Sequence, residues 1–114
     1  MPGAKRRLYR AGPPQSATHS YRVRYQGVHY VYVLRSLKDG KFYTGYTTDL
    51  RDRVATYNSG KARSTRNRRP LQLIYYKAYL VAQDAKAREQ FLKSGSGKRF
   101  IRRQLAHCLS GSSR

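Results

Sequence analysis

Acidic residues are scarce in this sequence. Its 114 residues include five Asp and Glu against 25 Lys and Arg, which gives a formal net charge of +20. Self-repulsion at this charge opposes a compact fold unless a polyanion relieves it. Nucleic acid is the usual polyanion, because neutralising its phosphates releases counterions. An anionic membrane and a merely charged soluble surface are the alternatives, and the membrane ranks low because the expected helices lack a broad apolar face.

Cysteine and long apolar runs are also nearly absent. The single cysteine, Cys108, excludes an internal disulfide and a multi-cysteine zinc site. No apolar run approaches the ~20 residues that span a bilayer, and the N-terminus has no apolar secretory segment. We therefore expect an intracellular protein, cytoplasmic and associated with the nucleoid, without a membrane partner.

The usual hydrolase and metal motifs are missing as well. His19, His29 and His107 share no metal-ligand spacing, and the five acids are too scattered for a two-metal site built from several carboxylates. The segment 95–98 reads Gly-Ser-Gly-Lys, but it has one residue between its glycines where a phosphate-binding Walker A loop has four. It is either a turn between helices, the favoured interpretation, or a helix N-terminus that offers amides to a phosphate.

Residues 1–27 differ from the rest of the chain. They contain six Lys and Arg, no acid and several Pro and Gly. This composition predicts a basic, mostly disordered arm, with a transit peptide or a start codon assigned too far upstream as alternatives. With 39% apolar residues over its full length, the chain can form one folded core. We expect a single domain at 28–109 and a loose tail at 110–114.

Turn and capping signals divide this domain into short elements. Asp39-Gly40 predicts a hairpin turn, Thr48-Asp49 a helix start and Asn58-Ser59-Gly60 a helix stop. The expected elements are strands at 30–37 and 41–46, a helix at 50–57, a basic loop at 61–69, a strand at 71–79, and helices at 84–93 and 98–109. The fold class is therefore α/β (α+β), with a small three-stranded, mainly antiparallel sheet flanked by about three helices.

Alternation sorts the predicted hairpin into two faces. The face expected to be core carries Val31, Val33, Leu37, Phe42 and Tyr46. The other face carries Tyr30, Tyr32, Leu34, Ser36, Tyr43 and Gly45, with Gly45 leaving space between Tyr32 and Tyr43. A two-residue turn would pair Leu37 with Phe42. The two tyrosines would then lie four positions apart, about 13 Å, so twist or a bulge would have to bring their hydroxyls together.

Two charged residues stand out on the expected helices. Arg53 lies three residues after Leu50 and four before Tyr57, which predicts that it lies on or beside the inward stripe of its helix. Glu89 is the only glutamate in the chain. Taken alone it is half of a helix salt bridge with Lys93, worth about 0.3 kcal/mol.

Together these residues resemble the GIY-YIG nuclease family. The first motif corresponds to Val31-Tyr32-Val33, the second to Tyr43-Thr44-Gly45, and Arg53 and Glu89 follow in the expected helices. The resemblance covers about residues 28–106 and is strongest to the small stand-alone bacterial members, which are similar to the N-terminal nuclease domain of UvrC. Only the tyrosine of the first motif is kept, Thr44 replaces an isoleucine, and Tyr57 stands where a histidine is frequent.

The resemblance implies a metal-dependent endonuclease that hydrolyses phosphodiester bonds in DNA, with repair or recombination as its setting. The implied catalytic residues are Tyr32, Tyr43, Arg53 and Glu89. Glu89 would hold Mg²⁺ or Mn²⁺, and Arg53 would bind a phosphate oxygen. Tyr32 would act as general base with a pKa lowered by the nearby cations. Tyr43 would orient the water or the phosphate.

Basic residues of the loop and the later helices would follow the DNA backbone without reading its sequence. We expect these contacts from Lys61, Arg63, Arg66, Arg68, Arg69, Lys93, Lys98 and Arg99. RNA is the alternative substrate, and a non-catalytic DNA- or RNA-binding protein with a degenerate nuclease fold is the alternative function. The sequence gives no indication of the oligomeric state.

Overall fold

The computed structural model describes residues 27–111. Its elements are β1 (His29–Ser36), β2 (Phe42–Thr47), α3 (Leu50–Asn58), the 3-10 turn η1 (Arg66–Arg68), β3 (Leu71–Tyr79), α4 (Ala82–Lys93), α5 (Gly95–Gln104) and α6 (Ala106–Ser110). The predicted basic arm, apart from Gly27, and the end of the predicted tail lie outside the described residues. None of the helices within 27–111 has the length and apolar character needed to cross a membrane.

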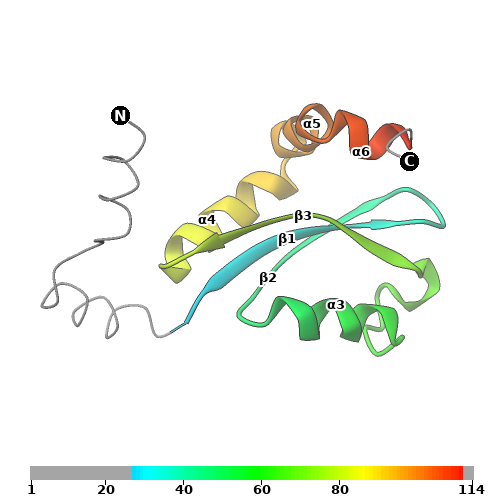
Figure 1. The fold of residues 1–114 in the computed structure, drawn as a ribbon, viewed down its shortest axis with the longest axis horizontal. Coiled ribbons are helices and arrows are strands. Elements are labelled where there is room, and N and C mark those ends of the chain that lie inside the picture. The colour runs from blue at the N-terminus through cyan, green and yellow to red at the C-terminus, as the bar shows by residue number, and fades with distance from the viewer. Residues whose placement is uncertain (1–26, 112–114) are drawn as a thin grey trace, which may run out of the picture.

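The sheet has three antiparallel strands in the order β2-β1-β3, so the predicted fold class is confirmed. β1 is central and pairs with both neighbours. An irregularity of the β1–β3 register lies between Val33 and Leu34, whose partners are Tyr75 and Leu73. Such a bulge bends a strand and adds to its twist, which is visible in the curved sheet of Figure 1.

Helices cover both faces of this sheet. α3 lies on one side and α4, α5 and α6 lie on the other (Figure 1). Val31 and Val33 pack with Leu92 and Ile101 on the α4–α5 side. On the α3 side the buried cluster consists of Tyr32, Leu34 and Leu71, packed against Tyr43, Leu50, Val54, Tyr57 and Leu73. Both faces are therefore core, and the expectation that only the Val31 face would be core is wrong.

The hairpin is closed by a longer loop than the Asp39-Gly40 signal suggested. The Ser36 amide donates to the Lys41 carbonyl at 2.9 Å, and the Gly40 amide donates to the Ser36 carbonyl at 2.8 Å. The Ser36 hydroxyl accepts from the amides of Lys38 and Asp39, both at 3.1 Å. Leu37 lies in this loop and is 51% exposed, so its predicted place in the core is wrong.

The longer loop changes the register by two residues. Tyr32 pairs with Gly45 and Leu34 pairs with Tyr43. Because the shift is even, every side chain keeps its predicted face. Tyr32 and Tyr43 now lie two positions apart instead of four, about 7 Å along the strands. The register thus supplies the shortening that the predicted pairing lacked.

Hydrogen bonds close both ends of α3, and those at its C-terminal end join it to the sheet. Asp49 caps its N-terminus by accepting from the Asp52 amide at 3.0 Å. At the other end the Asn58 side chain donates to the Leu71 carbonyl at 2.9 Å and accepts from the Leu71 amide at 2.8 Å. The helix that carries Arg53 is therefore held at one end by its connection to β2 and at the other by β3.

The Gly-Ser-Gly-Lys segment forms the first turn of α5, and Ser94 alone separates it from α4, so the favoured interpretation of a turn between the helices is wrong. Ser94 caps α5 by accepting from the Gly97 amide at 3.1 Å. A Cβ at Gly97 would lie 2.5 Å from Leu92 Cα and against the Phe91 carbonyl oxygen, so glycine lets the two helices cross closely. Both helices start earlier than expected, α4 at Ala82 and α5 at Gly95.

Candidate active site

Tyr32 lies beneath Gly45 in the sheet. Its side chain is 1% exposed, and the two residues are cross-strand partners. A Cβ at Gly45 would lie 2.5 Å from the ring carbon Cζ of Tyr32 and closer still to its hydroxyl oxygen. Contacts shorter than 3.0 Å are essentially never seen for real Cβ atoms. Glycine at position 45 is therefore what allows the Tyr32 ring to pass across β2 toward α3.

The Tyr32 hydroxyl ends beside α3. It lies 3.1 Å from the hydroxyl of Tyr57, and the two rings meet edge to face with centroids 6.1 Å apart. Burial, and then the hydrogen bond to Tyr57, raise the pKa of Tyr32 well above its ordinary value. The nearby Arg53 guanidinium lowers this pKa, but by less. The net direction is opposite to the lowered pKa expected for a general base.

Arg53 reaches this cluster from the solvent side. As a residue it is exposed, so it lies beside the inward stripe of α3 and not within it. Its guanidinium is nevertheless close enough to the Tyr32 hydroxyl to influence its pKa. A cation at the surface with a buried hydroxyl behind it can bind an anion while the hydroxyl donates a second hydrogen bond.

Tyr43 and Tyr57 complete the group on this face of the sheet. Both are partly buried and pack against the cluster that contains Tyr32. The structure thus brings Tyr32, Tyr43 and Arg53 of the predicted site to one region. It adds Tyr57, whose role the sequence left open. The signal for Tyr57 was its position one helical turn after Arg53, which places both side chains on the same side of α3.

Glu89 lies on α4, on the other side of the sheet. It lies between Ala85 and Leu92, both buried, at helical spacing, and its side chain is 17% exposed. Lys86 on the same helix lies over the Tyr46 ring of β2 at 5.2 Å. Arg88, on the opposite flank, reaches the Tyr75 hydroxyl of β3 at 3.5 Å. Glu89 is therefore on the flank of α4 that faces the edge strand β2.

The Glu89 carboxylate pairs with Lys93 Nζ at 3.1 Å. This is the helix salt bridge that the spacing of the two residues predicted. α3 follows β2 in the chain, and α4 packs against β1, β2 and β3 from the other face of the sheet, so Arg53 and Glu89 come from helices on opposite faces (Figure 1). That their groups meet in one cleft stays a prediction.

The described residues contain no group of three or more His, Cys, Asp or Glu that could enclose a metal ion. Glu89 is therefore a single carboxylate, partly exposed and next to a lysine. Mg²⁺ commonly binds one or two carboxylates and completes its shell with waters and substrate phosphates. The donor set at Glu89 fits that mode and does not fit a metal held by protein ligands alone.

The eight predicted DNA-contacting cations differ in how they are held. Arg68 pairs with Asp39 at 3.2 Å, and the Arg69 Nε donates to the Arg66 carbonyl at 2.7 Å. Arg99 donates to the Ser96 hydroxyl at 3.2 Å. Lys61, Arg63, Arg66 and Lys98 are exposed, and none of their side chains makes a hydrogen bond or ion pair of this kind to another described residue. Their contact with DNA stays a prediction.

This fold, with tyrosines on two paired strands and an arginine on the following helix, is a GIY-YIG-like α/β domain. Residues 28–102 match the family model described as the GIY-YIG catalytic domain. The chain therefore belongs to the GIY-YIG family, as its resemblance predicted. A nuclease-like function and a nucleic-acid substrate are what membership indicates.

Similar proteins carry the name UPF0213. The UPF0213 protein SH2523 of Staphylococcus haemolyticus is 44% identical over 69 residues, which are 60% of this chain and 83% of that protein. A UPF0213 protein of Bacillus pumilus is 43% identical over 72 residues, 62% of this chain and 72% of the relative. The solution NMR structure of the UPF0213 protein BH0048 from Bacillus halodurans is 39% identical and covers 74% of this chain and 87% of its own, with a TM-score of 0.42.

Proposed function

We propose that this protein is a divalent-metal-dependent endonuclease that hydrolyses phosphodiester bonds in DNA, in repair or recombination. The observation that carries the proposal is the arrangement of Tyr32, Tyr57 and Arg53. The two hydroxyls lie 3.1 Å apart, and the Arg53 guanidinium acts on the Tyr32 hydroxyl electrostatically. This arrangement lies within the residues that match the catalytic domain of the family.

In this proposal Arg53 binds the scissile phosphate. Its planar, cationic guanidinium can donate two parallel hydrogen bonds to phosphate oxygens. An exposed position supports this role, because the guanidinium is accessible to a polyanion. The charge that develops on the phosphate during water attack is then stabilised by a cation already in position.

The tyrosines act as neutral hydrogen-bond donors rather than as bases. The raised pKa of Tyr32 means that its hydroxyl keeps its proton near neutral pH. Tyr32 and Tyr57 share one hydrogen bond, which leaves the pair one further proton to donate to a phosphate oxygen or to hold the attacking water. Tyr43, on the same face, assists in that orientation. This role replaces the general base expected for Tyr32.

Glu89 is the residue that would hold Mg²⁺ or Mn²⁺. When bound, such an ion supplies charge neutralisation at the phosphate and a lower pKa for its coordinated water. Lys93 now pairs with the carboxylate at 3.1 Å. Lys93 would leave this pair when the cation binds, and its ammonium would then be available to a phosphate.

A second function is a binding protein without catalysis. The Glu89–Lys93 pair favours it, since a carboxylate neutralised by a lysine is a weaker metal ligand. The high positive charge supports binding in either case. This alternative expects salt-sensitive affinity and no metal-dependent cleavage.

The test is cleavage of supercoiled plasmid and of branched DNA, with Mg²⁺ or Mn²⁺ and with chelator, alongside an RNA of matching sequence. Arg53→Ala should reduce cleavage by about 100-fold or more. Arg103→Ala removes one positive charge from an exposed position of α5 and is the matched control. Wild-type protein that is inert with every metal and substrate would refute the nuclease proposal. Equal losses of cleavage in the two variants would mean that Arg53 contributes only a positive charge, as other surface cations do.

A further inference from the structure

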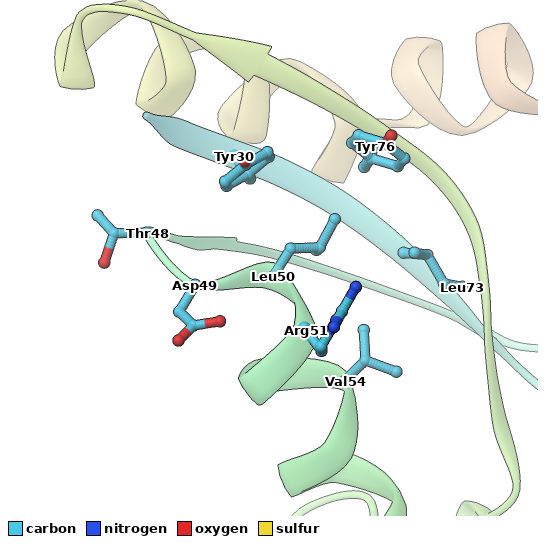
Figure 2. A pocket seen from close by; sticks show the side chains of 8 residues that line it. All are labelled: Tyr30, Thr48, Asp49, Leu50, Arg51, Val54, Leu73 and Tyr76. Carbon is cyan, nitrogen blue, oxygen red and sulfur yellow. The ribbon is translucent and has the colours of Figure 1, made fainter. Parts of the chain in front are cut away.

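A second feature of the α3 face is a hollow that none of Tyr32, Tyr43, Arg53 and Glu89 lines. Its volume is about 540 Å³, within the range of small-molecule sites. It lies between the first turns of α3 and the sheet, and Figure 2 shows Tyr30 and Tyr76 on the sheet side. Its lining residues are Tyr30, Thr48, Asp49, Leu50, Arg51, Val54, Leu73 and Tyr76.

The sheet side of the hollow is aromatic. Tyr30 and Tyr76 come from adjacent strands, and their ring centroids are 6.2 Å apart with the planes tilted by 59°. Tyr76 is 56% exposed, which is unusual for a large ring on a sheet face covered by a helix. α3 packs over Tyr32, Leu34 and Leu71 but leaves the Tyr76 ring open to solvent.

The helix side of the hollow combines apolar and charged groups. Leu50 and Val54 form its apolar wall, and Arg51 and Asp49 stand beside them (Figure 2). Asp49 uses one carboxylate oxygen to cap α3, and a carboxylate can accept further hydrogen bonds, for example from an amino group. Arg51 adds a cation that can bind a phosphate.

The hollow is a direct neighbour of the proposed active site. Tyr76 is the cross-strand partner of Tyr32, and directly paired residues on one face of a sheet have Cβ atoms about 5 Å apart. A group that stacks on Tyr76 therefore lies next to the tyrosine whose hydroxyl meets Tyr57. Val54, the residue that follows Arg53 in α3, also lines the hollow.

We propose that this hollow binds one unpaired nucleobase of a single-stranded segment, stacked on Tyr76 beside Tyr30. An open aromatic ring offers a base its flat face without regard to sequence. Arg51 and the net charge of +20 select a polyanionic chain over an apolar peptide. Bases within a duplex have both faces covered, so an unpaired one is required. The inference rests on the proposed action on nucleic acid and narrows it to substrates with an unpaired nucleotide.

The experiment measures binding by fluorescence anisotropy without divalent metal, so that no cleavage occurs. The probes are a labelled single-stranded DNA of about 12 nucleotides, an RNA of the same sequence, the matching duplex, and an abasic strand of equal length. The variants are Tyr76→Ala, Tyr76→Leu and Tyr76→Phe. The exposed ring makes all three compatible with folding, which a thermal unfolding curve checks.

Loss of the aromatic ring in Tyr76→Ala and Tyr76→Leu should weaken binding of the single strand by about 5–150-fold. Tyr76→Phe should retain the wild-type affinity, because it keeps the ring. The abasic strand and the duplex should bind all variants equally. Comparison of the DNA and RNA probes shows whether the pocket also distinguishes deoxyribose from ribose.

Unchanged affinity of Tyr76→Ala for the single strand would overturn the base pocket, and so would an equal loss for the abasic strand. A wild-type protein that binds none of the probes would refute both this inference and the proposed function. Wild-type protein that prefers the single strand through Tyr76 yet cleaves no substrate in the separate nuclease assay would refute the enzyme and leave the pocket standing.

Discussion

Gly45 lies over the ring of Tyr32, and the sheet has no room for a side chain at that position. The Tyr32 ring cannot swing aside easily, because it is 1% exposed and its hydroxyl is bonded to Tyr57. We expect Gly45→Ala to lower the free energy of unfolding by about 1–3 kcal/mol, as overpacking of a core does. It should also separate the Tyr32 and Tyr57 hydroxyls and reduce nuclease activity.

Urea unfolding of Gly45→Ala tests this packing. Gly27→Ala is the control, since a Cβ there meets nothing within 4 Å. Combining Gly45→Ala with Tyr32→Ala removes the obstructing ring. The double variant should therefore be less destabilised than the sum of the two single changes. Additive losses would contradict the contact between these two residues.

Alkaline pH should destabilise the protein through Tyr32. Burial raises the pKa of its phenol above the ordinary value of 10.0, so the folded state holds the proton more tightly than the unfolded chain. This contribution to stability is complete below the unfolded pKa and is lost as pH rises from about 10 through the folded pKa. The free energy of unfolding should fall by up to about 1.4 kcal/mol per pH unit from this group.

Tyr32→Phe removes that ionisable group and should flatten the alkaline slope. The variant should also lose about 0.5–1.5 kcal/mol at neutral pH with its hydrogen bond to Tyr57. Urea unfolding at a series of alkaline pH values measures both effects, and Tyr76→Phe, at a ring that is 56% exposed, is the control. Parallel slopes for wild type and Tyr32→Phe would mean that the buried hydroxyl has no such raised pKa.

The basic loop should determine the salt dependence of DNA binding. Each phosphate contact that is lost should reduce the slope of log K against log salt by about 0.9. We expect this reduction for Arg63→Ala, whose side chain is exposed in the predicted contact set. Lys38→Ala removes an exposed cation of the hairpin loop that is outside this set. Anisotropy titrations over a range of salt compare the two, and identical slopes would mean that the loop does not contact the backbone.

The faces of the hairpin could be predicted from the sequence, but its register could not. The alternation of side chains along a strand placed Val31 and Tyr32 on opposite faces of the hairpin. The register shift of two residues left both on their predicted faces. Asp39-Gly40 indicated where the chain turns and not how long the loop is. The loop length depends on the Ser36 hydroxyl, which accepts from two loop amides. That side-chain contact has no periodic signature.

For the site residues as well, the sequence predicted the side of an element on which a residue lies, but not its tertiary contacts. Spacing placed Arg53 and Tyr57 on one side of α3, and the Tyr32–Tyr57 hydrogen bond then required the tertiary packing of α3 on β1. Helical periodicity predicted Arg53 on or beside the inward stripe, and the residue is exposed while its guanidinium acts on the buried hydroxyl of Tyr32. The Tyr30–Tyr76 hollow depends on the pairing of β1 with β3, across an irregular register, and a single sequence contains no information on that pairing.

The most direct test of the proposed active site concerns Glu89, because its carboxylate pairs with Lys93 and is also the proposed metal ligand. The measurement is Mg²⁺- or Mn²⁺-dependent DNA cleavage by Glu89→Gln and Lys93→Met, with DNA binding measured in parallel. Both changes break the ion pair, but only the first removes the carboxylate. Glu89→Gln should bind DNA and lose cleavage by about 100-fold or more, while Lys93→Met, which keeps the carboxylate, should lose no more cleavage than its weaker DNA binding accounts for. Equal activity of Glu89→Gln and wild type would contradict the account.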